Sequence, residues 1–341
     1  MIKWTTGGLR TAAVSALLVG ATYGPASAQE GPVLLPEGFA HPNGIAHLPD
    51  GALLVGAVAT GNLLRVDRDG IVTTWREETA DLFAGTAIRY DPATDLLWIT
   101  SPDFLARNEI GGRERRPNRL AAVDVISREV VWSVEMPSEG FANDLALDGR
   151  GGVYVTETLL DRVYHLSGPG AEFVTVAEGS PLEPGILGPA GIVMLPNGDL
   201  VTGLYSDGAM FRIVMNTIDA PGRIERLDLA REIENPDGMA LAPDGRLVLI
   251  EGGVESGRGA LIAIDLNASP PHPVETLLDG LDMPLNLSLD GGRGVLTVGA
   301  LRSFMLQDPD IPVPDRFRVV PFDLGDWPRA AASPVTWKER P

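Results

Sequence analysis

The chain has 341 residues, of which 44% are hydrophobic and 21% are charged, a balance typical of a folded globular protein. A formal net charge of -19 argues against a nucleic-acid partner, because phosphates attract Lys and Arg, and favours a cation or a neutral small molecule. Because the sequence contains no cysteine, disulfides, thiolate metal ligands and a thiol nucleophile are excluded.

The first segment has the pattern of an export signal. Lys3 and Arg10 precede an apolar run from Thr11 to Val19, and Ala26-Ser-Ala supplies small residues for cleavage. The sequence therefore predicts a signal peptide over residues 1–28 and a periplasmic or secreted location. An uncleaved membrane anchor is the alternative, but the run is shorter than the roughly 20 residues that a spanning helix needs. No integral membrane segment is expected after cleavage.

An internal repeat organises residues 29–341. Each copy has a small or polar residue, a second small residue, an apolar stretch, a turn and a second apolar run. The copies begin at Asn43, Thr86, Asn143, Ala190, Asp237 and, in degenerate form, Leu285. Successive copies start 43, 57, 47, 47 and 48 residues apart. These spacings match the period of roughly 40–50 residues that is typical of a four-stranded propeller blade.

The elements within a copy support the same architecture. Turn chemistry such as Pro49-Asp-Gly separates the first two runs, and alternating segments such as 62–67 and 71–75 predict a third and a fourth strand. Residues 31–35 are expected to add an outer strand to the last blade and to close the ring. We therefore predict an all-β protein, a single-domain six-bladed β-propeller with four-stranded antiparallel blades, and a monomer. An open solenoid is disfavoured because no polar terminal caps are found.

The first residues of the copies are expected to meet on the propeller axis, since the innermost strands line its channel. Asn43, Asn143 and Asp237 carry side-chain oxygens there, and Asp144 is a second carboxylate if the strand register turns it inward. Oxygen-only ligands suit a hard divalent cation, of which calcium is the best match. The alternative is that Asn and Asp serve only as turn-like residues at the start of strands.

Three segments carry a family resemblance: Phe141-Ala-Asn-Asp-Leu-Ala, Asn235-Pro-Asp-Gly-Met and, more weakly, Pro42-Asn-Gly-Ile-Ala. With the repeat pattern over most of residues 33–300, they resemble the senescence marker protein and gluconolactonase-like (regucalcin-like) family, which is related to the paraoxonases and strictosidine synthase. The resemblance implies a channel cation, usually calcium, held by a Glu of the first blade, Asn residues of the middle blades and an Asp of the fifth. By position, Asn143 matches a metal-proximal Asn and Asp237 the ligand Asp.

The sequence departs from this family pattern at two expected ligands. Asn43 stands where the family has Glu, and Ala190 stands where it has Asn. The affinity for a dication should therefore fall unless water, Glu37 or Glu157 compensates. Thr86 stands where the paraoxonase branch has a His, so the base proposed for that branch is absent.

These residues lead to three functional hypotheses. The first is a calcium-dependent hydrolase of a lactone or related ester, in which Asp144 or Asp237 activates water and Thr86 and Glu157 contact the substrate. The second is a non-catalytic propeller with a degraded metal site, which binds a small molecule or a protein. The third is condensation of an amine with an aldehyde, which requires a channel carboxylate near the substrate amine. Glu157 and Glu251 are candidates for that carboxylate, but no specific feature of the sequence supports the reaction.

Overall fold

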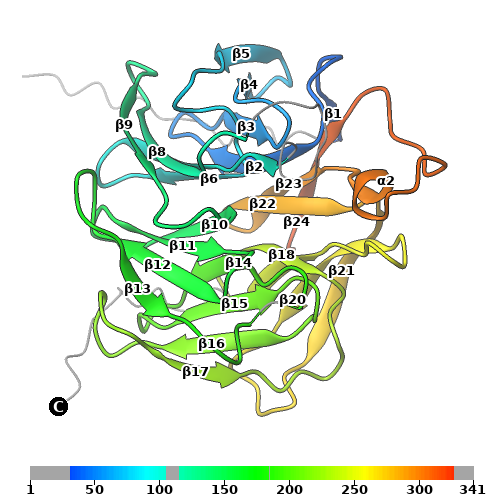
Figure 1. Ribbon diagram of the computed structural model, residues 1–341. Coiled ribbons are helices and arrows are strands. Elements are labelled where there is room, and N and C mark those ends of the chain that lie inside the picture. The colour runs from blue at the N-terminus through cyan, green and yellow to red at the C-terminus, as the bar shows by residue number, and fades with distance from the viewer. Residues whose placement is uncertain (1–30, 105–114, 184, 326–341) are drawn as a thin grey trace, which may run out of the picture.

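The repeats fold into six four-stranded sheets arranged around one axis (Figure 1), as the sequence predicts. The structure is a computed structural model, and it describes residues 31–104, 115–183 and 185–325. The predicted signal peptide, residues 1–28, lies outside the described residues. No helix in the described part of the chain is long and apolar enough to cross a membrane.

Each blade contributes one strand to each of four concentric positions. The inner strands are β2 (Pro42–His47), β6 (Ala87–Asp91), β10 (Ala142–Leu147), β14 (Pro189–Met194), β18 (Pro236–Leu241) and β22 (Pro284–Asp290). The second strands are β3 (Leu53–Ala57), β7 (Leu96–Ser101), β11 (Val153–Glu157), β15 (Leu200–Leu204), β19 (Leu247–Glu251) and β23 (Arg293–Val298). The third strands are β4 (Leu63–Val66), β8 (Arg119–Asp124), β12 (Arg162–Leu166), β16 (Met210–Val214), β20 (Gly259–Ile264) and β24 (Arg318–Asp323). The outer strands are β5 (Val72–Arg76), β9 (Val130–Glu135), β13 (Val174–Ala177), β17 (Arg223–Arg226), β21 (Val274–Leu281) and β1 (Val33–Leu34).

The turn between the first two strands of a blade depends on Asx chemistry. Asp50 Oδ1 accepts a hydrogen bond from the backbone N–H of Ala52 at 3.1 Å, and Gly51 takes a φ of 80°. Asp148 does the same in the third blade, accepting from Arg150 N–H at 2.7 Å. A short carboxylate and a glycine are the residues that such tight turns favour. The repeated turn motif therefore fixes where each hairpin reverses.

The ring is closed by the two ends of the described chain. β1 is antiparallel to β24, with Val33 opposite Val319, so the last blade takes its outer strand from the start of the described chain (Figure 1). Each inner strand also contacts the inner strands of both neighbouring blades, β22 and β2 included. The predicted closing strand is thus confirmed, and the array is not an open solenoid.

Most of the apolar core lies between the blades. Alternate residues of one strand face opposite neighbours. On β19, Leu249 packs between the fourth and fifth blades, whereas Val248 packs between the fifth and sixth. Six such clusters fill the six blade interfaces. A seventh cluster, which includes Ala190, Met283 and Leu285, lies where the inner strands begin.

The inner strands differ in one respect that bears on the axis. Five of them have a register shift near their first residues, as between Pro42 and Ile45 of β2. β6 has no such shift and pairs regularly with β7 from Ala87 onward. Asn43 therefore falls within a bulge, and Thr86, its counterpart in the sequence repeat, does not.

Candidate functional site

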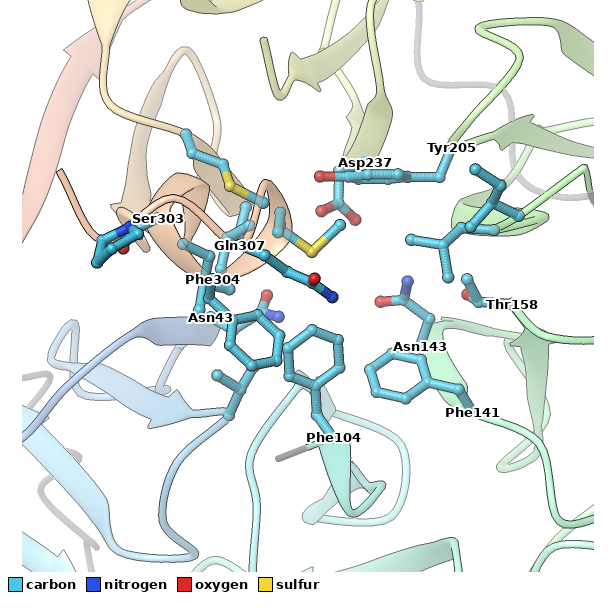
Figure 2. Close-up of a pocket in the computed structure, with 18 residues that line it drawn as sticks. Asn43, Phe104, Phe141, Asn143, Thr158, Tyr205, Asp237, Ser303, Phe304 and Gln307 are labelled. Carbon is cyan, nitrogen blue, oxygen red and sulfur yellow. The ribbon is translucent and has the colours of Figure 1, made fainter. Parts of the chain in front are cut away.

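A cavity of about 600 Å³ lies where the inner strands begin. Asn43, Asn143 and Asp237 all line it, although they come from the first, third and fifth blades. Figure 2 shows their side chains pointing toward the middle of the cavity. The structure thus brings together the three residues that the sequence predicts as metal ligands.

Threonines of the second strands hold the backbone at these positions. Thr297 Oγ1 donates to the carbonyl oxygen of Asn43 at 2.8 Å, and Thr100 Oγ1 donates to that of Asn143 at 2.9 Å. Each bond joins one blade to the next. A β-bulge frees a carbonyl from the strand ladder, and a buried carbonyl needs a partner. The hydroxyls supply it and fix the direction in which each asparagine side chain leaves the strand.

A glycine permits the close approach of the fifth blade. A Cβ atom on Gly191 would overlap the carbonyl oxygen of Asp237. The small second residue of the repeat therefore has a steric role, because it lets adjacent inner strands converge tightly enough for their first residues to share one cavity.

Of the three converging side chains, only the Asp237 carboxylate has a hydrogen-bond donor among the described residues, the backbone N–H of Gly238. Among the described residues, the side-chain amides of Asn43 and Asn143 form no hydrogen bond to another residue, and the Asp237 carboxylate pairs with no cation. Asn43 and Asp237 are each only 6% exposed. Buried polar groups are normally hydrogen-bonded, so these oxygens are available to a ligand.

Burial raises the pKa of Asp237 well above its usual value, and the negative charge of Asp144 raises it further. Tyr205 lines the same cavity, and burial together with the Asp237 charge raises the pKa of its phenol well above 10. Its buried hydroxyl has no hydrogen-bond partner among the described residues. Tyr205 therefore stays a neutral hydroxyl that can donate a hydrogen bond into the cavity.

Asp144 occupies a different environment, although it follows Asn143 directly. Its side chain is fully buried and is not part of the cavity lining. Arg89 of β6 donates to Asp144 Oδ1 at 2.8 Å, and the N–H of Ile192 donates to Oδ2 at 3.2 Å. Arg89 also reaches Asn286 Oδ1 at 3.4 Å. Burial raises the pKa of Asp144, and the guanidinium of Arg89 opposes that rise.

The two predicted substrate-binding residues lie outside the described lining. Thr86 is buried, and its hydroxyl has no partner in the described part of the chain. Glu157 is fully buried at the end of β11, where it accepts hydrogen bonds from Ser138 Oγ at 3.1 Å and from the N–H of Phe141. Burial raises the pKa of Glu157 to about 7. Its contacts make it a support for the segment that carries Phe141 into the cavity wall.

Residues just beyond the second strands also line the cavity, and the sequence analysis missed them. Val58, Thr158 and Tyr205 follow β3, β11 and β15 at equivalent positions. Aligning the repeats to the end of the second strand would have found this second ring. Phe104 and Phe304 lie outside the repeat altogether, so no repeat alignment could have placed them.

The donor chemistry of the cavity fits a hard divalent cation. Two amide oxygens and one carboxylate are the ligand types that calcium accepts, with water or substrate oxygens completing six to eight ligands. The described residues contain no group of three or more His, Cys, Asp or Glu side chains that could hold a metal ion. A cation here would therefore depend on the amides of Asn43 and Asn143 beside Asp237.

No family model and no curated protein matches the chain. Solved structures do match it. A gluconolactonase from Xanthomonas campestris is 14% identical with a TM-score of 0.59, and the match covers 87% of this chain and 96% of that one. A virginiamycin B lyase from Staphylococcus aureus is 13% identical with a TM-score of 0.57, over 85% and 98%. A glucose dehydrogenase-type protein from a Thermus species is 14% identical with a TM-score of 0.55, over 85% and 99%.

The names of these neighbours span three reaction types, so the shared fold does not by itself decide the reaction. Gluconolactonases are among the similar structures, as the resemblance of the repeats led us to expect. At these identities the likeness establishes the fold: the chain is a six-bladed propeller of the architecture that gluconolactonases also use.

Proposed function

We propose that the protein is a metal-assisted hydrolase of a lactone or related ester, acting in the cavity at the propeller axis. One observation carries the proposal: Asn43, Asn143 and Asp237, from three separate blades, direct into one cavity side-chain oxygens that have no side-chain partner among the described residues. A purely structural set of buried polar groups would satisfy one another, as Asp144 and Arg89 do.

The residues divide the work as follows. Asn43, Asn143 and Asp237 would hold the cation. A bound divalent cation supplies Lewis-acid polarisation of the substrate carbonyl. Asp237 is the only carboxylate among the described lining residues, so it is also the group that can accept a proton from the attacking water. Tyr205 keeps its proton and can donate a hydrogen bond to a substrate oxygen.

In this proposal Asp144 influences the cavity by its charge, without lining it. Its pairing with Arg89 keeps it from the substrate, and its negative charge favours a cation beside Asp237. Of the two predicted catalytic carboxylates, only Asp237 would then touch the substrate. Asp144 would act through its negative charge on the electrostatic potential at the cation.

The test is hydrolysis of a panel of uncharged lactones and esters by protein freed of metal, before and after addition of calcium, magnesium, manganese or zinc. Turnover that chelator abolishes and one metal restores supports the proposal. Isothermal calorimetry on the wild type and Asp237→Ala measures cation binding separately, and the variant should bind at least tenfold more weakly.

Metal-loaded protein that turns over no member of the panel contradicts the proposal. Thermal stabilisation by a panel compound without its hydrolysis would indicate the non-catalytic binding hypothesis instead, because a ligand of the folded state raises the melting temperature.

A further inference from the structure

One wall of the cavity is made of three phenylalanine rings. Phe104 follows β7, Phe141 precedes β10, and Phe304 lies on helix α2 (Arg302–Met305) after β23. The ring centroids of Phe104 and Phe141 are 5.4 Å apart, and those of Phe104 and Phe304 are 5.0 Å apart. Figure 2 shows the three rings along one side of the cavity, with Asp237 and Tyr205 on the other. The cavity therefore has a polar half and an aromatic half.

The aromatic half continues toward the mouth as an apolar surface. Met283 and Met305 line the cavity and belong to one apolar cluster with Phe104 and Phe304, and thioethers pack well against aromatic groups. Ile186 also lines it and is 80% exposed. An isoleucine left that open at the rim of a cavity offers a first apolar contact to an incoming molecule.

The lining offers no partner to an anionic substrate. Asp237 is the only charged side chain among the described lining residues, and none of them is Lys, Arg or His. A carboxylate or phosphate on the substrate would lose its hydration, gain no cationic partner from the wall and face Asp237. The side chains of the described lining therefore favour an uncharged substrate.

A sugar placed against the phenylalanine wall finds few partners, since Tyr205 and Asp237 lie on the opposite side of the cavity (Figure 2). The hydroxyl of Thr158 already donates to the carbonyl of Pro189 at 2.6 Å, and that of Ser303 donates to the carbonyl of Asp308 at 2.8 Å. Hydroxyl groups placed against Phe104, Phe141 and Phe304 would be desolvated without hydrogen bonds. A polyhydroxylated lactone would therefore bind poorly against this aromatic wall.

We propose that the site selects an uncharged ester or lactone that carries an aromatic or comparably bulky apolar group, with that group against Phe104, Phe141 and Phe304 and the carbonyl toward Asn43, Asn143 and Asp237. This inference rests on the proposed hydrolase function. It assigns specificity to Phe304, which the loop between β23 and β24 brings to the axis. Arg302 Nε anchors that loop by donating to the carbonyl of Val254 at 2.8 Å.

The experiment compares kcat/KM for three lactones of equal ring size, unsubstituted, phenyl-substituted and polyhydroxylated, in the wild type and in Phe304→Ala. We expect the wild type to prefer the phenyl compound by at least about tenfold, which is the scale on which apolar pockets discriminate. Phe304→Ala should lower kcat/KM for the phenyl compound, chiefly through KM, and bring the ratio of its kcat/KM to that of the unsubstituted lactone toward one. Phe304→Leu should restore part of the preference. Leu306→Ala, which alters an exposed residue outside the lining, is the matched control.

Binding of the corresponding lactams, which resist hydrolysis, separates this inference from the proposed function. Hydrolysis without a phenyl preference, or with a preference for the polyhydroxylated lactone, overturns the inference and leaves the function standing. Phenyl-lactam binding that depends on Phe304, with no lactone or ester hydrolysed, supports the apolar ligand class and overturns the hydrolase proposal. Absence of both turnover and lactam binding overturns both.

Discussion

Two adjacent residues on one strand, Asn143 and Asp144, belong to two layers of the propeller axis that differ in whether their polar side chains have partners. The upper layer, formed by Asn43, Asn143 and Asp237, opens into the cavity and has no side-chain partners among the described residues. The lower layer, formed by Arg89, Asp144 and Asn286, is closed by an ion pair at 2.8 Å and further hydrogen bonds. A step of one residue along β10 separates an unsatisfied group from a satisfied one.

This difference distinguishes a carboxylate held for stability from one available for chemistry. Asp144 has a guanidinium and a backbone N–H, so its charge is compensated inside the fold. Asp237 is nearly as buried, at 6% exposed against 0% for Asp144, but has no cationic partner in the described part of the chain. A buried charge without a counterion is costly to the folded state. Its retention at the cavity is best explained by a ligand that supplies the compensation.

Removing the carboxylate of the upper layer should affect activity and not stability. We expect Asp237→Ala to lower kcat/KM for the best substrate by about 1,000-fold or more, because a Lewis-acid site and a proton acceptor are lost together. Without added metal, its melting temperature should match or exceed that of the wild type, since an uncompensated buried carboxyl group is removed. Asp279→Ala removes an exposed carboxylate and is the control. A large drop in stability with little loss of activity would mean that Asp237 is a structural residue.

Breaking the ion pair of the lower layer should lower the stability of the fold. Arg89→Met leaves Asp144 buried without its cation, and we expect a loss of about 3 kcal/mol in the free energy of unfolding, the scale measured for broken buried pairs. Urea unfolding measures it. The double variant Arg89→Met with Asp144→Asn should recover much of the loss. Arg65→Met, which breaks surface pairs with Asp50 and Asp67, should cost at most about 1 kcal/mol. Equal losses for the two arginine variants would contradict the distinction between the layers.

The fold could be predicted from the sequence because its signals are local and repeated. Each blade carries its own turn motif and alternating strands, and equal spacing indicates the ring. Even the closing strand at Val33–Leu34 follows, since a ring of sheets must bury its last edge. The positions of Asn43, Asn143 and Asp237 were also predictable, because equivalent residues of inner strands converge by symmetry.

The rest of the site depends on departures from that symmetry. β6 lacks the bulge of the other inner strands, which takes Thr86 out of the ring of equivalent positions, and nothing in the repeat indicates this. Arg89 of the second blade reaches Asp144 of the third, a contact that only the three-dimensional convergence of strands reveals. Phe304 is brought to the axis by a loop whose path is set by contacts with residues far away in the chain, such as Val254. Local patterns carry no information about such contacts.

Glu157 is a third buried carboxylate to set beside Asp144 and Asp237, and its stability contribution should depend on pH. It is buried beside the cavity wall, and its hydrogen bonds come only from neutral groups. Its pKa is raised to about 7 in the folded protein, so the folded state binds the proton more tightly than the unfolded state. Stability should therefore fall as pH rises from about 4.5 to about 7 and then level off. Relative to Glu157→Gln, which does not titrate, the wild type should lose about 3 kcal/mol between pH 4 and pH 8.

Urea midpoints of the two proteins at several pH values give this difference. Glu172→Gln, which replaces an exposed carboxyl group, is the control for the overall change in charge. A difference between the wild type and Glu157→Gln that does not change with pH would mean that Glu157 is compensated by a charge as Asp144 is.

The smallest effect concerns the hydroxyls that hold the upper layer. Thr297 Oγ1 donates to the carbonyl of Asn43 at 2.8 Å, and Thr202 Oγ1 donates to that of Gly191 at 2.8 Å, next to Ala190, which has no donor atom. Thr202→Val removes one buried hydrogen bond at constant shape and should cost about 1 kcal/mol in urea unfolding. Thr297→Val also removes the acceptor of the Asn286 N–H at 3.2 Å, so it should cost about 1 to 2 kcal/mol. Only Thr297→Val loosens a strand that carries a proposed ligand, and only it should weaken cation binding in calorimetry, by about threefold to tenfold. If both variants weaken cation binding equally, the effect comes from a general loosening of the ring and not from the direction of the Asn43 side chain.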